Sequence, residues 1–374
     1  MKGKLKKKVF AAMSGGVDSS VAALLLAKNT KYEVIGCFIK GYNIDGCQET
    51  DAEDARRVAE KLKIPFYVWD FEDEYKNKVV DYMIGGYRNG ITPNPDVMCN
   101  KEIKFGLFLK KALEMGADFV ATGHYVRRRP EFPIINYQFL NTPESIENCK
   151  LKIAKDLDKD QSYFLWALTQ EQLRHCLFPI GDYLKRKVRE IARKADLPTA
   201  EKKDSQGICF LGAVKFKDFL KQYLPVKKGD VLSIKGEKMG EHDGVWFYTI
   251  GQRHLKISNL KSKISNHRPY YVVEKNIKKN ILIVAEGENN PALRKKEVDL
   301  TDVNFINPAI HNFKSTFPVF ARIRYRQPLV KAELEKSGGG WKLIFSKPVK
   351  FVAAGQSAVF YAKNGEMLGG GVII

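Results

Sequence analysis

The 374-residue sequence has no long apolar run and no signal-like start. The longest uninterrupted apolar run near the start, residues 21–27, is about a third of the roughly 20 residues that a membrane-spanning helix needs. The Lys-rich start is followed by an apolar stretch too short for a signal peptide, and it lacks the Arg/Ser character of a transit peptide. We therefore expect a cytoplasmic protein with no membrane partner.

The six cysteines contain no CxxC pair. Cysteines scattered in this way predict neither a disulfide framework nor a zinc ribbon, and they favour a reducing compartment. A cysteine with a special role is then expected to react rather than to cross-link the fold. The cysteines are Cys37, Cys47, Cys99, Cys149, Cys176 and Cys209.

Acidic residues are few relative to basic ones: 43 Asp and Glu stand against 63 Lys and Arg, which gives a net charge of +20. This excess favours a polyanionic partner, nucleic acid first and an anionic membrane second. Hydrophobic residues make up 44% of the chain, which is enough for packed cores and excludes wholesale disorder. The length is natural for two or three domains.

The first 125 residues alternate between strand and helix signals, which predicts an α/β fold with a doubly wound parallel sheet. In such sheets ligands bind at the carboxyl ends of the strands, where residues 14–20 and 123–124 fall. The expected strands are residues 9–13, 34–39, 66–69 and 119–122, and the expected helices are residues 17–28, 51–62, 75–87 and 101–115.

The rest of the chain changes character twice. Residues 126–158 are expected to form a loop or hairpin insertion, and residues 160–224 are expected to be mostly helical. After Pro225, short β-branched and aromatic runs separated by Gly, Asn and Pro predict one or two small antiparallel barrels. The predicted domains are residues 1–158, 159–225 and 226–374.

The string SGGVDSS at residues 14–20 joins the first expected strand to the first helix. Its glycines allow a tight turn near an anion, its serines add donors, and Asp18 can hold Mg²⁺ against a phosphate. The Walker pattern GxxxxGK[ST] is absent, so P-loop γ-phosphoryl transfer is not indicated. The string resembles the SGGxDS loop of ATP pyrophosphatases, which cleave ATP between the α and β phosphates and adenylate a substrate. An ordinary β–α turn is the alternative.

Two cysteines lie in loops next to lysines. Cys99 follows the proline-rich residues 92–98 and is expected just before, or in the first turn of, the helix from about residue 101. Cys209 lies in residues 204–210, after Lys202 and Lys203. Nearby lysines favour the thiolate of both cysteines, as does the helix start for Cys99. The alternative for each is an inert cysteine beneath a loop.

Together these strings resemble the tRNA-specific 2-thiouridylases of the MnmA type, almost end to end from Val9 to about Val372. The two cysteine strings together with KDQSYFL at residues 159–165 are the most specific part of the resemblance. The other matching strings are TPNPDVMCNKEIKF at 92–105, ATGHY at 121–125, GQR at 251–253, YRQ at 325–327 and GQSAVFY at 355–361. The resemblance implies a PP-loop ATP pyrophosphatase domain, a small helical domain and a C-terminal β-barrel region.

The resemblance also implies a set of binding residues. The ATP-binding positions are Ala12, Met13, Ser14, Gly15, Gly16, Val17, Asp18, Ser19, Ile39 and Gly123. The tRNA-binding positions are Asn94, Pro95, Asp96, His124, Lys159, Asp160, Gln161, Arg324, Tyr325 and Gln356, of which the first three grip the target uridine. The basic excess is expected to form a tRNA-binding surface that includes Lys185, Arg186, Lys187, Arg322, Arg324, Arg326 and Lys331.

The implied reaction is ATP-dependent 2-thiolation of an unpaired wobble uridine in tRNA. The uridine C2 oxygen is adenylated with MgATP, Asp18 holds the Mg²⁺, and sulfur comes from a persulfide on Cys209. Cys99 is the nucleophile, so a Cys99–Cys209 disulfide forms. Asp96 either assists proton movement or has only a structural role in its loop. The implied partners are tRNA and a sulfur-relay or cysteine desulfurase donor protein, with the free enzyme a monomer.

The chain departs from this family at Ile39, where Met is common, at Gln206, where Thr is common, and at residues 254–258, where glycines are usual. Three alternatives remain open: another PP-loop enzyme, such as a 4-thiouridine synthetase or an amide-forming enzyme; a non-catalytic RNA-binding protein; and an iron–sulfur site that uses Cys99 and Cys209. Two cysteines are too few for a four-thiolate cluster, so Asp96 or an external ligand would have to complete it.

Overall fold

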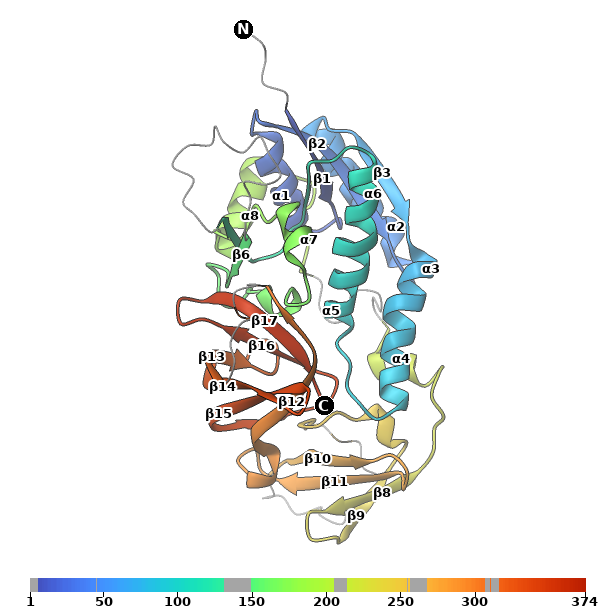
Figure 1. Ribbon diagram of the computed structural model, residues 1–374. Helices are drawn as coiled ribbons and strands as arrows, with labels where there is room; N and C mark the ends of the chain where they lie inside the picture. The colour runs from blue at the N-terminus through green and yellow to red at the C-terminus, as the bar shows by residue number, and fades with distance from the viewer. Residues whose placement is uncertain are drawn as a thin grey trace.

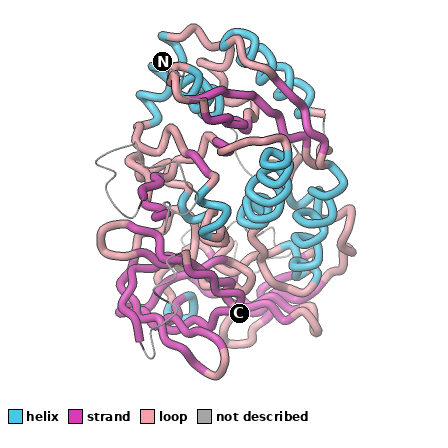
Figure 2. The backbone as a smooth tube through the Cα atoms, turned by 45° about the horizontal axis from the view of Figure 1, so that its top comes forward, coloured by secondary structure: helices cyan, strands magenta, loops and turns pink. Residues whose placement is uncertain are grey.

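The computed structural model describes residues 6–44, 46–130, 149–204, 214–253, 255, 268–306, 310 and 316–374. The molecule is elongated, with the N-terminal α/β part at one end and the strand-rich C-terminal part at the other (Figure 1). Figure 2 shows the same separation, with helices around the N-terminal strands and mostly strands in the other half. In the described part, no helix combines the length and the apolar character needed to cross a bilayer.

The N-terminal sheet is parallel and has the strand order β3-β2-β1-β4-β7. Its central strand is β1, which aligns Val9 with Val34 of β2 on one side and with Phe119 of β4 on the other. The loop after β1 therefore lies at the middle of the carboxyl edge. The strands are β1 (Lys7–Ala12), β2 (Tyr32–Lys40), β3 (Phe66–Asp70), β4 (Phe119–Ala121) and β7 (Cys176–Leu177).

Helices cover both faces of this sheet, as expected for a doubly wound fold. Val9 and Ala11 of β1 pack with α1, α2 and α8, whereas Phe10 packs with the helices between residues 72 and 114. The helices on the first face are α1 (Val17–Ala27), α2 (Cys47–Leu62) and α8 (Lys185–Lys194). The other face has two continuous helices: α3 (Glu72–Tyr75), η1 (Lys76–Val80) and α4 (Asp81–Arg88), then α5 (Pro95–Met98), η2 (Cys99–Leu107) and α6 (Phe108–Glu114), where η1 and η2 are π-helical.

The stretch predicted to be mostly helical also supplies a strand. It contains η5 (Ser162–Phe164), α7 (Gln170–Arg174), α8 and α9 (Phe216–Leu220), and its β7 pairs with β4 in the parallel sheet. The predicted boundaries after residues 158 and 225 remain a prediction.

The C-terminal region forms two β units, as the short apolar runs predicted. A four-stranded sheet has the order β10-β11-β8-β9, with β8 (Gly229–Ser233), β9 (Lys238–His242), β10 (Tyr270–Asn276) and β11 (Ile281–Glu286). It is mixed rather than antiparallel as predicted, because β11 and β8 pair in parallel. The second unit has the order β12-β15-β14-β13-β16-β17 and closes into a barrel because β12 also pairs with β17. Its strands are β12 (Arg294–Phe305), β13 (Thr316–Arg322), β14 (Val330–Ser337), β15 (Gly340–Lys350), β16 (Ser357–Tyr361) and β17 (Glu366–Ile373).

The barrel docks on the N-terminal part through a hairpin and a buried ion pair. The expected hairpin forms from β5 (Arg127–Pro130) and β6 (Cys149–Lys152), and β6 pairs with β17. Beside it, the Arg322 guanidinium donates to the Asp160 carboxylate and, at 2.8 Å, to the Tyr361 hydroxyl. Arg322 is only 8% exposed, so the prediction that it belongs to an exposed tRNA-binding surface is wrong. The apolar residues beside Arg322 in β13 did not predict that its guanidinium pairs with a buried carboxylate.

This junction generates a stability prediction. Arg322→Met leaves the Asp160 carboxylate buried without its cation, which costs about 3 to 5 kcal/mol of unfolding free energy. Adding Asp160→Asn to the same protein should restore part of that loss. Urea unfolding of both variants measures the effect.

The exposed pair Lys342–Glu297 serves as the control, because Lys342→Ala should cost less than about 1 kcal/mol. Equal losses from Arg322→Met and Lys342→Ala would contradict the prediction.

Candidate active site

The loop between β1 and α1 has the geometry of an anion cradle. Gly15 adopts φ +70°, and a Cβ there would lie 2.2 Å from the Asp51 carbonyl oxygen, so the turn requires glycine. Gly16 caps α1 without a side-chain hydrogen bond to the helix N-terminus. The Ser19 hydroxyl accepts from the Ser14 amide at 3.1 Å and donates to the Gly16 carbonyl at 3.1 Å. The helix start therefore offers N–H groups and its positive dipole end to an anion.

Gly123, from the loop after β4, lies against this helix start. A Cβ on Gly123 would lie 2.6 Å from the Ser19 amide nitrogen, so a larger residue would obstruct the cradle. Met13 and Val17 are buried and anchor the loop, whereas Ala12 and Ile39 are partly exposed at the ends of adjacent strands. The residues predicted to bind ATP thus gather at one edge of the sheet.

Asp18 carries the charge of this loop and lies in a network of ions. Its carboxylate accepts from the Tyr125 hydroxyl at 2.7 Å and from the Lys185 ammonium at 2.7 and 2.8 Å. Lys185 also contacts Asp204 at 2.8 Å, and Asp204 in turn contacts Lys159 and Arg189, each at 2.7 Å. The side chains of Asp18, Lys185 and Asp204 are 32%, 12% and 29% exposed.

Two pKa values in this network are displaced. Burial would raise the pKa of Asp204, but hydrogen bonds from Lys159 and Lys185 hold it at about 2, so the carboxylate is charged at neutral pH. Burial, together with the charge of Asp18, raises the pKa of Tyr125, which stays a neutral donor. At physiological pH, Asp204 is therefore an anion and Tyr125 a neutral hydroxyl.

The segment predicted to grip a base begins the helix that contains Cys99. Asn94 caps this helix by accepting from the Val97 amide at 3.3 Å, and Pro95 occupies its first turn. The helix therefore begins at Pro95, and the predicted start near residue 101 is wrong. Cys99 lies a full turn inside the helix, where its amide donates to the carbonyls of Pro95 and Asp96, so it is not at the helix start as predicted. Cys99 is 4% exposed.

The barrel holds this segment from the other side. The Gln356 side-chain amide donates to the Thr92 carbonyl at 2.9 Å and to the Pro93 carbonyl at 3.2 Å. The Thr92 amide donates to the Ala354 carbonyl at 2.7 Å. Gly355, at φ +88°, comes so close that a Cβ would lie 2.9 Å from the Thr92 oxygen. Gln356 therefore contacts the two residues directly before Asn94, Pro95 and Asp96, the residues predicted to grip the base.

Several other residues predicted to contact tRNA have protein partners. His124 is buried, with Nδ1 2.8 Å from the Thr122 hydroxyl, and Asp160 belongs to the barrel junction. The Gln161 side chain accepts from the Tyr125 amide at 2.9 Å.

The predicted tRNA contacts in the C-terminal region also have protein partners. Arg324 donates to the carbonyls of Phe351 at 3.0 Å and Ile250 at 2.7 Å. The Tyr325 ring lies 4.6 Å from the Phe164 ring. Their predicted contacts with tRNA stay predictions. Cys209 and Gln206 lie outside the described residues.

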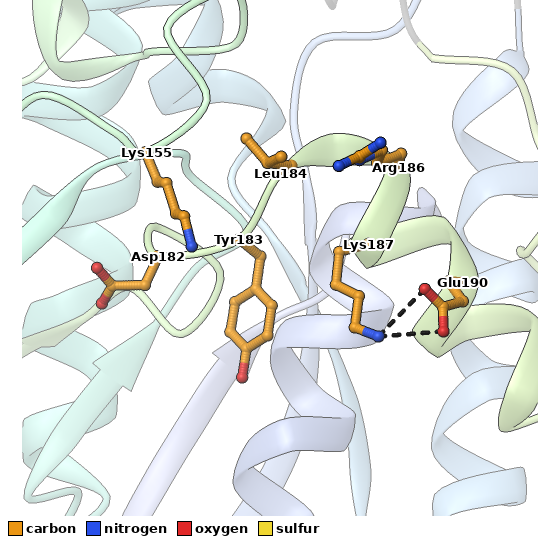
Figure 3. Close-up of a pocket in the computed structure, with 7 residues that line it drawn as sticks. All are labelled: Lys155, Asp182, Tyr183, Leu184, Arg186, Lys187 and Glu190. Carbon is orange, nitrogen blue, oxygen red and sulfur yellow. Dashed lines mark hydrogen bonds and ion pairs between the residues drawn. The ribbon is translucent and has the colours of Figure 1, made fainter.

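The predicted basic surface includes residues 185–187. Arg186 and Lys187 are exposed, whereas Lys185 points towards Asp18. A cavity of about 550 Å³ lies at the start of α8 (Figure 3). Lys187 donates at 3.0 Å to Glu190, which lies one turn further along the same helix. The lining residues are Lys155, Asp182, Tyr183, Leu184, Arg186, Lys187 and Glu190.

Tyr125, Asp204 and Arg189 are site residues that the sequence reasoning did not identify. Tyr125 and Asp204 end or begin strings singled out in the sequence, so adjacency to those strings was the available signal. The sequence held no signal for Arg189, because no motif near it points to a contact with Asp204.

The chain matches three known domain families in succession. Residues 7–213 match the family described as tRNA methyl transferase HUP domain. Residues 217–286 match the tRNA methyl transferase PRC-barrel domain, and residues 295–373 match the aminomethyltransferase beta-barrel domain.

Curated relatives extend over nearly the whole chain. A tRNA-specific 2-thiouridylase MnmA of Bacillus licheniformis is 44% identical over 98% of this chain and 94% of its own length. The tRNA-specific 2-thiouridylase MnmA 1 of Geobacillus kaustophilus is 46% identical over 98% of this chain and 95% of its own length. Among solved structures, the U34-tRNA thiolase NcsA of Methanococcus maripaludis with its [4Fe-4S] cluster is 18% identical, with a TM-score of 0.36, over 59% of this chain and 68% of its own. A score that low supports no argument about this chain.

The buried His124 generates a pH prediction. Burial, and then the charge of Lys104, lowers the pKa of His124 well below 6.5 in the folded protein. The unfolded chain binds this proton near pH 6.5, so the folded state loses stability as the pH falls below that value. We expect the unfolding free energy to fall by up to about 1.4 kcal/mol per pH unit between pH 6.5 and 5.5 from this group.

Urea unfolding at pH 7.5, 6.5 and 5.5 checks this expectation when the wild type is compared with His124→Gln. The variant should depend less on pH over this range. The same pH dependence in both proteins would contradict the assignment of a neutral, buried imidazole.

Proposed function

Because the chain belongs to the MnmA family of tRNA-specific 2-thiouridylases, we propose that it converts the wobble uridine of tRNA to 2-thiouridine with consumption of ATP. The observation that carries the proposal is the anion cradle of residues 13–19, whose acid Asp18 lies at the same sheet edge as Gly123. The second support is the helix that begins at Pro95, because its cap and first two turns bring Asn94, Asp96 and Cys99 close together in the chain.

The first step activates a poor leaving group. The uridine C2 oxygen attacks the α-phosphorus of ATP, an O–P bond forms, and pyrophosphate leaves. The amides at the start of α1 and the Ser14 and Ser19 hydroxyls stabilise the charge on the phosphates. The carbon at C2 then bears an adenylate, which departs as AMP in the next step.

Mg²⁺ is proposed to enter with ATP rather than to reside in the protein. Among the described residues, no cluster of three or more His, Cys, Asp or Glu could hold a metal. A single carboxylate plus substrate phosphates is an ordinary Mg²⁺ site, and Asp18 at the cradle fits that role. When bound, the ion would neutralise the phosphates.

Sulfur is proposed to arrive as a persulfide on Cys209. Its terminal sulfur attacks C2, the bond to oxygen breaks, and AMP leaves. The Cys99 thiolate then attacks Sγ of Cys209, which breaks the S–S bond, releases 2-thiouridine and leaves a Cys99–Cys209 disulfide. An external thiol reduces the disulfide, and a donor protein reloads the persulfide. Asp96 accepts a proton during these steps.

The base must leave its stack to react, because C2 is inaccessible in a stacked helix. We propose that Asn94, Pro95 and Asp96 hold the flipped uridine. The exposed cations near α8, including Arg186 and Lys187, then contact the phosphate backbone around it. We also propose that the free enzyme is a monomer.

Two of the matched family descriptions name methyl transfer, but the geometry favours thiolation. Transfer of a methyl group from a sulfonium donor cleaves no phosphate bond, so it gives no reason for a glycine cradle beside an acid. It also requires no pair of cysteines. ATP-dependent release of pyrophosphate is the property that separates the two reactions.

The two-cysteine step can be tested with variants. With MgATP, a persulfide donor and tRNA, the wild type should form 2-thiouridine, whereas Cys99→Ala and Cys209→Ala should lower product formation at least 1,000-fold. Both variants should still release pyrophosphate on first contact with tRNA, because adenylation precedes sulfur transfer. Nucleoside mass spectrometry and a pyrophosphate assay give the two readouts.

Cys176→Ala is the matched control, because Cys176 is buried in β7 and should be dispensable for the chemistry. Full activity of either Cys99→Ala or Cys209→Ala would remove that cysteine from the mechanism.

A further inference from the structure

The anion cradle of residues 13–19 contains no lysine, yet Lys185 of the distant helix α8 contacts its acid, Asp18. Lys185 begins α8, which packs against α1 through the buried residues Val188 and Ala192. The Lys185 ammonium lies 2.7 and 2.8 Å from the two oxygens of Asp18. We propose that Lys185 is a phosphate-binding residue of the nucleotide site, which contacts the β and γ phosphates of ATP. This inference rests on the proposed binding of MgATP by the loop.

The position of Lys185 is fixed by its surroundings. Its backbone amide donates to the Asp156 carboxylate at 2.8 Å, which holds the first turn of α8. Its side chain is only 12% exposed and its ammonium lies 5.9 Å from the centre of the Tyr125 ring. A lysine held in this way brings a positive charge to the loop without the loss of freedom that a solvent-exposed lysine would incur on binding.

The charges around Lys185 allow it to change partner. Asp204 keeps two other cations, Lys159 and Arg189, so its carboxylate stays compensated when Lys185 moves away. Asp18 would gain Mg²⁺ in place of the ammonium when MgATP binds. No buried charge is then left without a counter-charge, which is the condition for a low-cost exchange.

The other cations near the loop are less suited to this task. The Lys202 ammonium is already paired with two carboxylates of α2, Asp51 at 2.6 Å and Asp54 at 2.5 Å. Lys159 and Arg189 contact Asp204 rather than the acid of the loop. Within the described residues, Lys185 is the cation paired with Asp18.

A binding experiment on the full-length protein tests the inference. The dissociation constants of α,β-methylene-ATP and of AMP are measured with Mg²⁺ by calorimetry for the wild type, Lys185→Met and Lys185→Arg. We expect Lys185→Met to weaken the ATP analogue by about 10- to 100-fold and to change AMP binding less than about 2-fold, because AMP lacks the β and γ phosphates. Lys185→Arg should recover much of the lost affinity.

The comparison of the two nucleotides separates phosphate binding from a merely structural role. Lys194→Met, at the exposed end of the same helix, is the matched control and should bind both ligands as the wild type does. Should Lys185→Met fail to fold, Lys185→Gln gives the same comparison, with thermal unfolding as the check on folding.

Two results would overturn the inference alone, and a third would overturn it together with the proposed function. Equal weakening of both nucleotides in Lys185→Met would make the lysine only a support of the loop. Unchanged binding of both, in a wild type that binds the analogue, would exclude Lys185 from the site and leave the proposed function standing. A wild type that binds no MgATP analogue would instead contradict the proposed function itself.

Discussion

The ion pair between Asp18 and Lys185 is the contact on which the arrangement of the site depends. It joins the first turn of α1 to the first turn of α8, two helices whose sequences are more than 150 residues apart. Through Lys185 it also reaches Asp204, which precedes Cys209 by five residues in the sequence, and Lys159, a predicted tRNA contact. One group of charges thereby connects the segments proposed to bind ATP, to carry sulfur and to contact tRNA.

A second constraint comes from the barrel. Its loop at residues 353–356 binds Thr92 and Pro93 through backbone and side-chain hydrogen bonds, directly before the cap of the Cys99 helix. The buried Arg322–Asp160 pair and the β6–β17 pairing keep the barrel against the N-terminal part. The C-terminal half therefore does more than supply a basic surface, because it sets where the proposed base-gripping residues lie.

Much of the fold was predictable because it depends on local patterns. Apolar runs marked β1, β2, β3 and β4 and some of the C-terminal strands, but not β9, β12, β14 or β17. The start of the Cys99 helix was misread because prolines at 93 and 95 suggest a loop, although Asn followed by Pro is also a helix-start signal. The burial of Arg322 and the orientation of Lys185 could not be predicted, since each depends on a carboxylate more than 150 residues away. The role of Cys209 remains a prediction.

Isotope transfer distinguishes adenylation of the uridine C2 oxygen from any other use of ATP. The substrate is tRNA with ¹⁸O at C2 of the wobble uridine, turned over with MgATP and a persulfide donor. We expect one ¹⁸O atom in each AMP released, with none in pyrophosphate or water, because the oxygen leaves C2 still bonded to the α-phosphorus. AMP without ¹⁸O, alongside 2-thiouridine formation, would contradict adenylation.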